Sequence, residues 1–142
     1  MPQFACVVLV DRRGWILLQE RDEFPAIDPE KWGLAGGHLE PGEEPADGAA
    51  RELLEETGVR LTPADLTLWS VIEVFHEAYG TDDRMHVYAA AADLTDADIE
   101  CHEGRQIVFV APDRARTLDL TASAAVAVPG FLESGLYASM TP

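Results

Sequence analysis

The stretch of residues 37–59 constrains the fold of this chain more than any other. It reads GHLEPGEEPADGAARELLEETGV, a glycine-containing segment followed by a run that carries the marks of a helix. Pro45 suits the first helical turn, where the backbone N–H that proline lacks would be unpaired anyway. Gly58 suits the position just after the last turn. The sequence therefore predicts a helix from about Pro45 to Thr57.

Three carboxylates gather on one side of this expected helix. At about 100° per residue, Glu52, Glu55 and Glu56 share a single arc, and an apolar face lies beside it. Crowded carboxylates raise one another's pKa values, and a divalent cation relieves that repulsion. Mg²⁺ in proteins is usually held by a few carboxylates together with substrate phosphates. The arc predicts a cation site, with a solvated acidic helix face as the alternative reading.

The same residues resemble the Nudix box, G-x5-E-x7-R-E-U-x-E-E-x-G-U, in which U is a bulky apolar residue. Every specified position is filled between Gly37 and Val59. The chain is thus similar to the Nudix hydrolases, which cleave a nucleoside diphosphate from a linked moiety. The resemblance implies an α/β fold, an α/β/α sandwich with a mixed β-sheet, as a single domain over residues 1–142.

The resemblance also implies roles for residues of the box. The carbonyl of Gly37 and the carboxylates of Glu52, Glu55 and Glu56 are expected to hold Mg²⁺ or Mn²⁺. Glu52 is expected to act as the base or to orient the attacking water as well. Arg51 is expected to orient the glutamates through charge-assisted hydrogen bonds. Glu43 is expected to brace the loop and helix rather than to bind metal.

Nudix enzymes often use one further acid from outside the box. Glu103, in HEGRQIVFV just before the last expected strand, fits best as a catalytic metal ligand. Glu77 and Glu100 are its rivals, because acidic residues are frequent throughout this chain.

Candidates for substrate binding come from segments near the box. Trp32, Phe75 and Tyr79 are aromatic residues that could stack on a base, with core packing as the alternative. Arg21 could pair with a phosphate or a base edge. The box leaves the substrate open among nucleoside triphosphates, dinucleoside polyphosphates, ADP-ribose and nucleotide sugars. The small size of the chain favours a nucleoside triphosphate first. A catalytically silent nucleotide-binding module is the alternative function.

Charge and composition narrow the remaining classes. The 142 residues include 26 acidic and 10 basic side chains, a net charge of −16. That balance argues against nucleic acid as a partner, since binding its backbone needs a basic patch. We find neither a signal peptide nor a stretch long enough to span a bilayer, so we expect a cytoplasmic protein with a small-molecule nucleotide substrate. The sequence does not decide whether the protein forms a homodimer.

The rest of the chain predicts strands before and after the box helix, and a second helix near the C-terminus. A turn is expected over 78–83, a loop over 22–31 and a glycine loop over 35–37. Thr121 is the expected N-cap of the last helix, and Pro129 is expected to kink or break it. The expected strands cover 4–10, 15–20, 32–34, a long or bulged segment over 66–75, 85–92 and 106–110, and the last helix covers 119–134.

Overall fold

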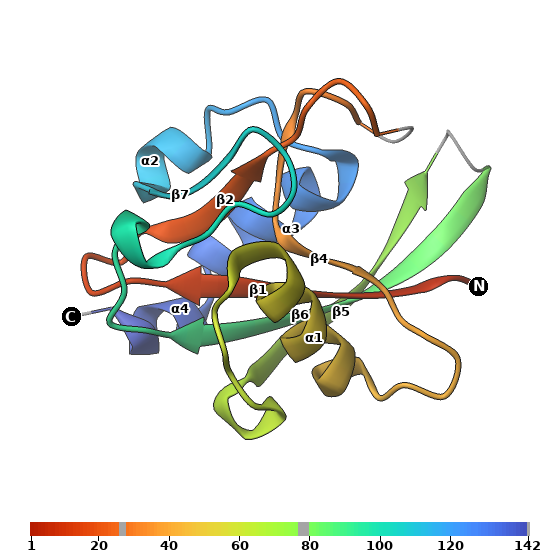
Figure 1. Ribbon diagram of the computed structural model, residues 1–142, viewed down its shortest axis with the longest axis horizontal. Coiled ribbons are helices and arrows are strands. Elements are labelled where there is room, and N and C mark those ends of the chain that lie inside the picture. Colours follow the sequence, from red (N-terminus) through yellow and green to blue (C-terminus); the bar gives the residue numbers. More distant parts are fainter. Residues whose placement is uncertain (26–27, 77–79, 142) are drawn as a thin grey trace.

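The computed structural model describes residues 1–25, 28–76 and 80–141, which form a seven-stranded mixed sheet with helices on both faces (Figure 1). The strands are β1 (Gln3–Val10), β2 (Ile16–Glu20), β3 (Trp32–Gly33), β4 (Ala35–His38), β5 (Thr67–His76), β6 (Thr81–Ala91) and β7 (Gln106–Val110). The helices are α1 (Pro45–Thr57), α2 (Pro112–Ala115), α3 (Ala122–Leu132) and α4 (Gly135–Met140), with 3₁₀ turns at Pro63–Asp65 and Asp96–Asp98.

Strand β1 is the centre of the sheet. The main path runs β3-β2-β1-β6-β5, and β4 and β7 pair with β1 and β2 respectively. The β1–β6 pair is parallel and the other pairs are antiparallel, so the sheet is mixed as predicted. Side chains of β1 alternate between the two faces of the sheet and are buried on both, which explains its continuous apolar run.

Each face of the sheet carries its own core. Helix α1 packs on one face through Ala49 and Leu53. Helix α3 packs on the other through Val128 and Phe131, and α4 lies on the same side (Figure 1). This arrangement is the predicted α/β/α sandwich.

Local signals in the sequence set the ends of α1. The helix runs from Pro45 to Thr57 as predicted. Gly58 takes the left-handed conformation, with φ 74°, and its N–H bonds to the carbonyl of Leu54. Glycine reaches this conformation without the steric penalty that a side chain would bring. The predicted bulge in the long strand is also present, between Leu68 and Ser70.

Several expected boundaries were wrong. The stretch predicted as a glycine loop belongs to β4, where Gly36 pairs with Cys6 of β1. Strand β6 begins at Thr81, so the end of the expected turn is strand; residues 78 and 79 lie outside the described residues. Helix α3 continues through Pro129 without a break, while Thr121 caps it by accepting a hydrogen bond from the Ala124 N–H.

Within the three described ranges, no helix is both long and apolar enough to span a membrane.

Candidate active site

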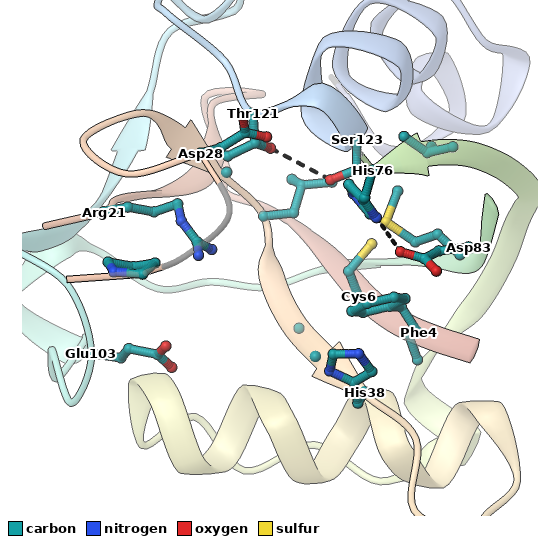
Figure 2. A pocket seen from close by; sticks show the side chains of 18 residues that line it. Phe4, Cys6, Arg21, Asp28, His38, His76, Asp83, Glu103, Thr121 and Ser123 are labelled. Atoms are coloured by element: carbon teal, nitrogen blue, oxygen red, sulfur yellow. Dashed lines mark hydrogen bonds and ion pairs between the residues drawn. The ribbon is translucent and has the colours of Figure 1, made fainter. Parts of the chain in front are cut away.

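A cavity of about 350 Å³ opens beside β4 (Figure 2). Gly36 and Gly37 form part of one wall, and Glu103 projects toward it from the loop before β7. Phe4 and Met85 line it from the strands of the sheet. Its size lies within the range of small-molecule sites in proteins.

The two glycines of β4 bring carboxylates of α1 to the cavity wall. A Cβ on Gly37 would stand 2.7 Å from a carboxylate oxygen of Glu52, closer than real Cβ contacts. A Cβ on Gly36 would stand 2.3 Å from the carbonyl oxygen of Ala5. Only glycine allows this approach of strand, helix side chain and neighbouring backbone.

Glu56 is the buried carboxyl of the group, with a relative exposure of 5%. Its Oε2 accepts a hydrogen bond of 2.9 Å from the backbone N–H of Gly36. Burial, a hydrogen bond shared with Glu103, and repulsion from Glu103 and Glu52 together raise the pKa of Glu56 to about 9. A buried acid among other acids, with a raised pKa, marks a place that lacks positive charge.

Arg51 forms hydrogen bonds with three glutamates of the box. Its Nε and Nη2 donate to the two oxygens of Glu43 at 2.8 and 3.0 Å, a bidentate pair that lowers the pKa of Glu43 to about 2. Its Nη1 donates to Glu52 at 3.1 Å and to Glu55 at 3.2 Å, and Nη2 also reaches the carbonyl of His38 at 3.2 Å. Arg51 thus contacts two of the three expected glutamate ligands on α1, Glu52 and Glu55, and the Glu43 carboxylate holds Arg51 in place.

Glu52 and Glu55 differ in their surroundings although both contact Arg51. The side chain of Glu55 is 56% exposed, whereas that of Glu52 is 15% exposed. Burial raises the pKa of Glu52 above its ordinary value, against the attraction and hydrogen bond of Arg51, and repulsion from Glu55 and Glu103 adds to the rise. Glu52 is therefore the more shielded of the two carboxyls that Nη1 of Arg51 contacts.

Backbone hydrogen bonds fasten the Glu103 loop to the end of α1. The N–H groups of Glu100 and His102 donate to the carbonyls of Thr57 and Glu56, both at 2.9 Å. His102 also donates from Nδ1 to the carbonyl of Glu55 at 2.7 Å. These bonds satisfy carbonyls that a helix leaves unpaired at its last turn. They place Glu103 beside the carboxylates of the box.

The expected substrate-binding residues are spread over the molecule. Arg21 lines the cavity at the end that holds Glu103 (Figure 2). Trp32 packs against the core on the α3 side, and Phe75 lies on the face of β5 opposite to the cavity-lining Val74. Neither residue contributes to the described cavity lining. Tyr79 and the rival acid Glu77 lie outside the described residues.

The sequence did not predict that two polar residues of the cavity wall lie side by side. His76 of β5 and Asp83 of β6 are hydrogen-bonded to each other in the cavity wall. Pairing the two strands across Gly80 would have shown that both face the same side of the sheet, but that register requires the structure.

The donor chemistry of this region fits a hard divalent cation. Carboxylates from α1 and from the Glu103 loop, together with main-chain oxygens of β4, are the oxygen ligands that Mg²⁺ and Mn²⁺ take. Among the described residues, no three acidic, histidine or cysteine side chains are grouped as a ready metal site. Arg51 donates hydrogen bonds to Glu52 and Glu55, and the N–H of Gly36 donates to Glu56. Binding a cation would exchange some of these hydrogen bonds for metal ligation.

Comparison with known proteins identifies the family. The model of the NUDIX domain matches residues 1–131. The nucleoside triphosphatase NudI of Salmonella agona is 28% identical over 118 residues, which cover 79% of this chain and 84% of that protein. The CMP-5′-(N-acetyl-N-hydroxy-3-aminopropyl)phosphonate hydrolase of Streptomyces rubellomurinus is 35% identical over 82% of this chain and 55% of its own length. The crystal structure of a MutT NUDIX hydrolase from Burkholderia pseudomallei superposes with a TM-score of 0.73, at 26% identity, over 90% of this chain and 95% of that one. The chain therefore belongs to the Nudix family of hydrolases.

Proposed function

We propose that this Nudix hydrolase cleaves the pyrophosphate linkage of a nucleoside triphosphate with the help of Mg²⁺ or Mn²⁺. The family acts on nucleoside diphosphate derivatives, and the choice among them is the part that we infer. The observation that carries the proposal is that Glu103 interacts with Glu52 and Glu56, which lie against Gly37 and Gly36, and that these glycines and Glu103 line a cavity large enough for a nucleoside.

Glu52, Glu55, Glu56 and Glu103, with the Gly37 carbonyl, would hold the cation. A bound divalent cation supplies positive charge to the phosphate oxygens and lowers the pKa of bound water. The raised pKa of Glu56 supports this assignment, because a carboxyl crowded by other carboxyls gains most from a nearby cation.

The protein residues then have separate tasks. Glu52 lies against Gly37 at the cavity wall, so its carboxylate is placed to accept a proton from water or to orient it. Arg51 keeps Glu52 and Glu55 directed to one side through Nη1. Glu103 comes from the loop fastened to α1 and shares a hydrogen bond with Glu56, so it adds a carboxyl from outside the helix to the acidic group. In phosphoryl transfer such positioning and electrostatic help account for most of the catalysis.

Two considerations favour a nucleoside triphosphate. The Salmonella relative, which matches most of this chain along most of its own length, carries the name of a nucleoside triphosphatase. The described cavity beside β4 suits one nucleoside. The net charge of −16 requires that cations accompany any phosphate-rich substrate, which is consistent with a metal-dependent reaction.

The test is a substrate panel. Purified protein is incubated with Mg²⁺ and with nucleoside triphosphates, dinucleoside polyphosphates, ADP-ribose or nucleotide sugars, and released phosphate is measured after coupling to pyrophosphatase or phosphatase. We expect turnover of a triphosphate that stops in EDTA and returns with added Mg²⁺. Faster turnover of another class would replace the substrate assignment. Saturable binding without turnover of any class would favour a silent binding module instead.

A further inference from the structure

The far end of the cavity carries a buried polar pair. His76 and Asp83 lie at the side of the cavity away from Glu103 (Figure 2). They come from neighbouring antiparallel strands, where His76 pairs in register with Thr81 and Asp83 with Val74. A substrate whose phosphates lie at the carboxylate end would therefore present its other end to this pair.

Burial makes the pair unusual. Asp83 is 1% exposed and His76 is 9% exposed. Moving such groups out of water costs free energy that their mutual attraction repays only in good geometry. The proposed hydrolytic step uses neither residue. A buried pair of this kind in a cavity wall is a candidate for ligand recognition.

The contacts of Asp83 decide which atom can meet a ligand. Its Oδ2 bonds to Nδ1 of His76, and its Oδ1 accepts a hydrogen bond of 3.0 Å from the hydroxyl of Thr81. Both oxygens are thus engaged within the protein. A carboxylate only accepts, so Nδ1 of His76 carries the hydrogen, and in that tautomer Nε2 is an acceptor.

Apolar and polar side chains share the wall around the pair, and Ser123 is a polar residue beside His76 (Figure 2). Phe4, Val74 and Met85 are apolar, and burial raises the pKa of the neighbouring Cys6 thiol to about 12, which keeps it neutral. The Phe4 ring lies edge-on to His76, with centroids 5.8 Å apart. An aromatic heterocycle would bury its faces here and place one polar edge against His76.

We propose that His76, held in one tautomer by Asp83, accepts a hydrogen bond from an amino group on the substrate base. The site then prefers adenine or cytosine to the corresponding keto bases. This inference rests on the proposed function only in taking the ligand to be a nucleotide. It concerns recognition of the base and not the cleavage step.

The first arm of the test uses the wild-type protein. Dissociation constants of AMP, IMP, CMP and UMP are measured by calorimetry in Mg²⁺, so that no turnover is needed. AMP and IMP differ by an amino or keto group at one position, as do CMP and UMP. One hydrogen bond left unmade in a buried site corresponds to about tenfold or more in affinity. We expect that advantage for AMP over IMP and for CMP over UMP.

The second arm removes the pair. The double variant His76→Phe/Asp83→Leu replaces both partners by apolar side chains and leaves neither group unpaired, which protects the fold. We expect both ratios to fall to within about twofold of unity. The control is His86→Phe on β6, the strand that carries Asp83. The His86 side chain bonds to Gln3 and faces the other side of the sheet. The control variant should keep the wild-type ratios.

Each outcome decides the inference. Equal affinities within each pair of the wild type, or tighter binding of IMP and UMP, would overturn it. So would wild-type ratios retained in the double variant, or no saturable binding of any monophosphate. If the double variant fails to fold, the wild-type ratios decide alone. Hydrolysis in the substrate panel with equal base affinities would leave the proposed function intact while rejecting the role of His76.

Discussion

Raising the pH should destabilise the metal-free protein through Glu56. The pKa of this carboxyl is about 9 in the folded protein, against 4.5 for an ordinary glutamate. Between these values the folded protein keeps a proton that the unfolded chain has released. The stabilising contribution is complete below pH 4.5 and is lost as the pH rises to about 9.

The size of the effect follows from proton linkage. Where the folded state holds one proton more than the unfolded chain, each unit by which the pH rises lowers the free energy of unfolding by about 1.4 kcal/mol. From about pH 5 to about pH 7 the loss attributable to Glu56 is therefore about 3 kcal/mol. That is a large share of the stability of a domain of this size, typically about 5–15 kcal/mol.

The measurement compares the wild type with Glu56→Gln in EDTA. Urea unfolding at several pH values, followed by the fluorescence of the three tryptophans, yields the free energy of unfolding. Glutamine resembles the protonated glutamate and does not titrate, so ionisable groups that do not interact with Glu56 cancel in the difference between the two proteins. We expect the wild type to lose about 3 kcal/mol relative to the variant between about pH 5 and pH 7.

Two results would refute this reasoning. A difference that stays constant with pH would show that Glu56 titrates normally in the folded protein. A difference that changes in the opposite direction would show that the carboxylate form is favoured. Added Mg²⁺ should restore the wild type at about pH 7, because metal ligation replaces the proton and stabilises only the folded state.

Four further substitutions test three parts of the site. Arg51→Lys should lower kcat by at least about tenfold in a steady-state assay, because an ammonium group lacks the planar fork that bonds both oxygens of Glu43 while reaching Glu52 and Glu55; a normal kcat would show that orientation by Arg51 is dispensable. Gly37→Ala should lower kcat while the melting temperature changes little, since the new Cβ displaces only the flexible carboxyl of Glu52; unchanged kcat and KM would contradict the close approach. Glu103→Gln should lower kcat about 10²-fold under saturating Mg²⁺, and Glu100→Gln should leave it near the wild-type value; the reverse order would move the outer acid to Glu100.

Local chemistry explains why the sequence predicted helix α1 so closely. Pro45 and Gly58 act within one turn of the helix ends, and the spacing of Glu52, Glu55 and Glu56 along a helix fixes their common face. The strand pattern likewise predicted the mixed sheet. The helix ends, the common face of the glutamates and the strand pattern all depend on residues that are close to one another in the sequence.

Long-range contacts decided what the sequence could not predict. Strand β4 contains two glycines, which carry no strand signal, and it pairs with residues 4–7 of β1, where α1 approaches closely. Helices α2 and α4 are too short for a clear period. The Glu103 loop takes its place from hydrogen bonds to carbonyls of α1, more than forty residues earlier in the chain. Trp32 was a candidate for stacking because its segment lies near the box, with core packing as the alternative; it is partly buried and packs against the core on the α3 side.

The rate of Glu52→Gln tests the central claim most directly. The claim is that carboxylates of α1, brought to the cavity by the glycines of β4, carry out metal-dependent hydrolysis. With saturating Mg²⁺ and the preferred substrate, we expect kcat to fall by about 10²–10⁴ while the melting curve shows a folded protein. The matched control is Asp47→Asn, an exposed acid in the first turn of the same helix, which should keep the wild-type rate. Wild-type turnover by Glu52→Gln, or an equal loss in Asp47→Asn, would contradict the account.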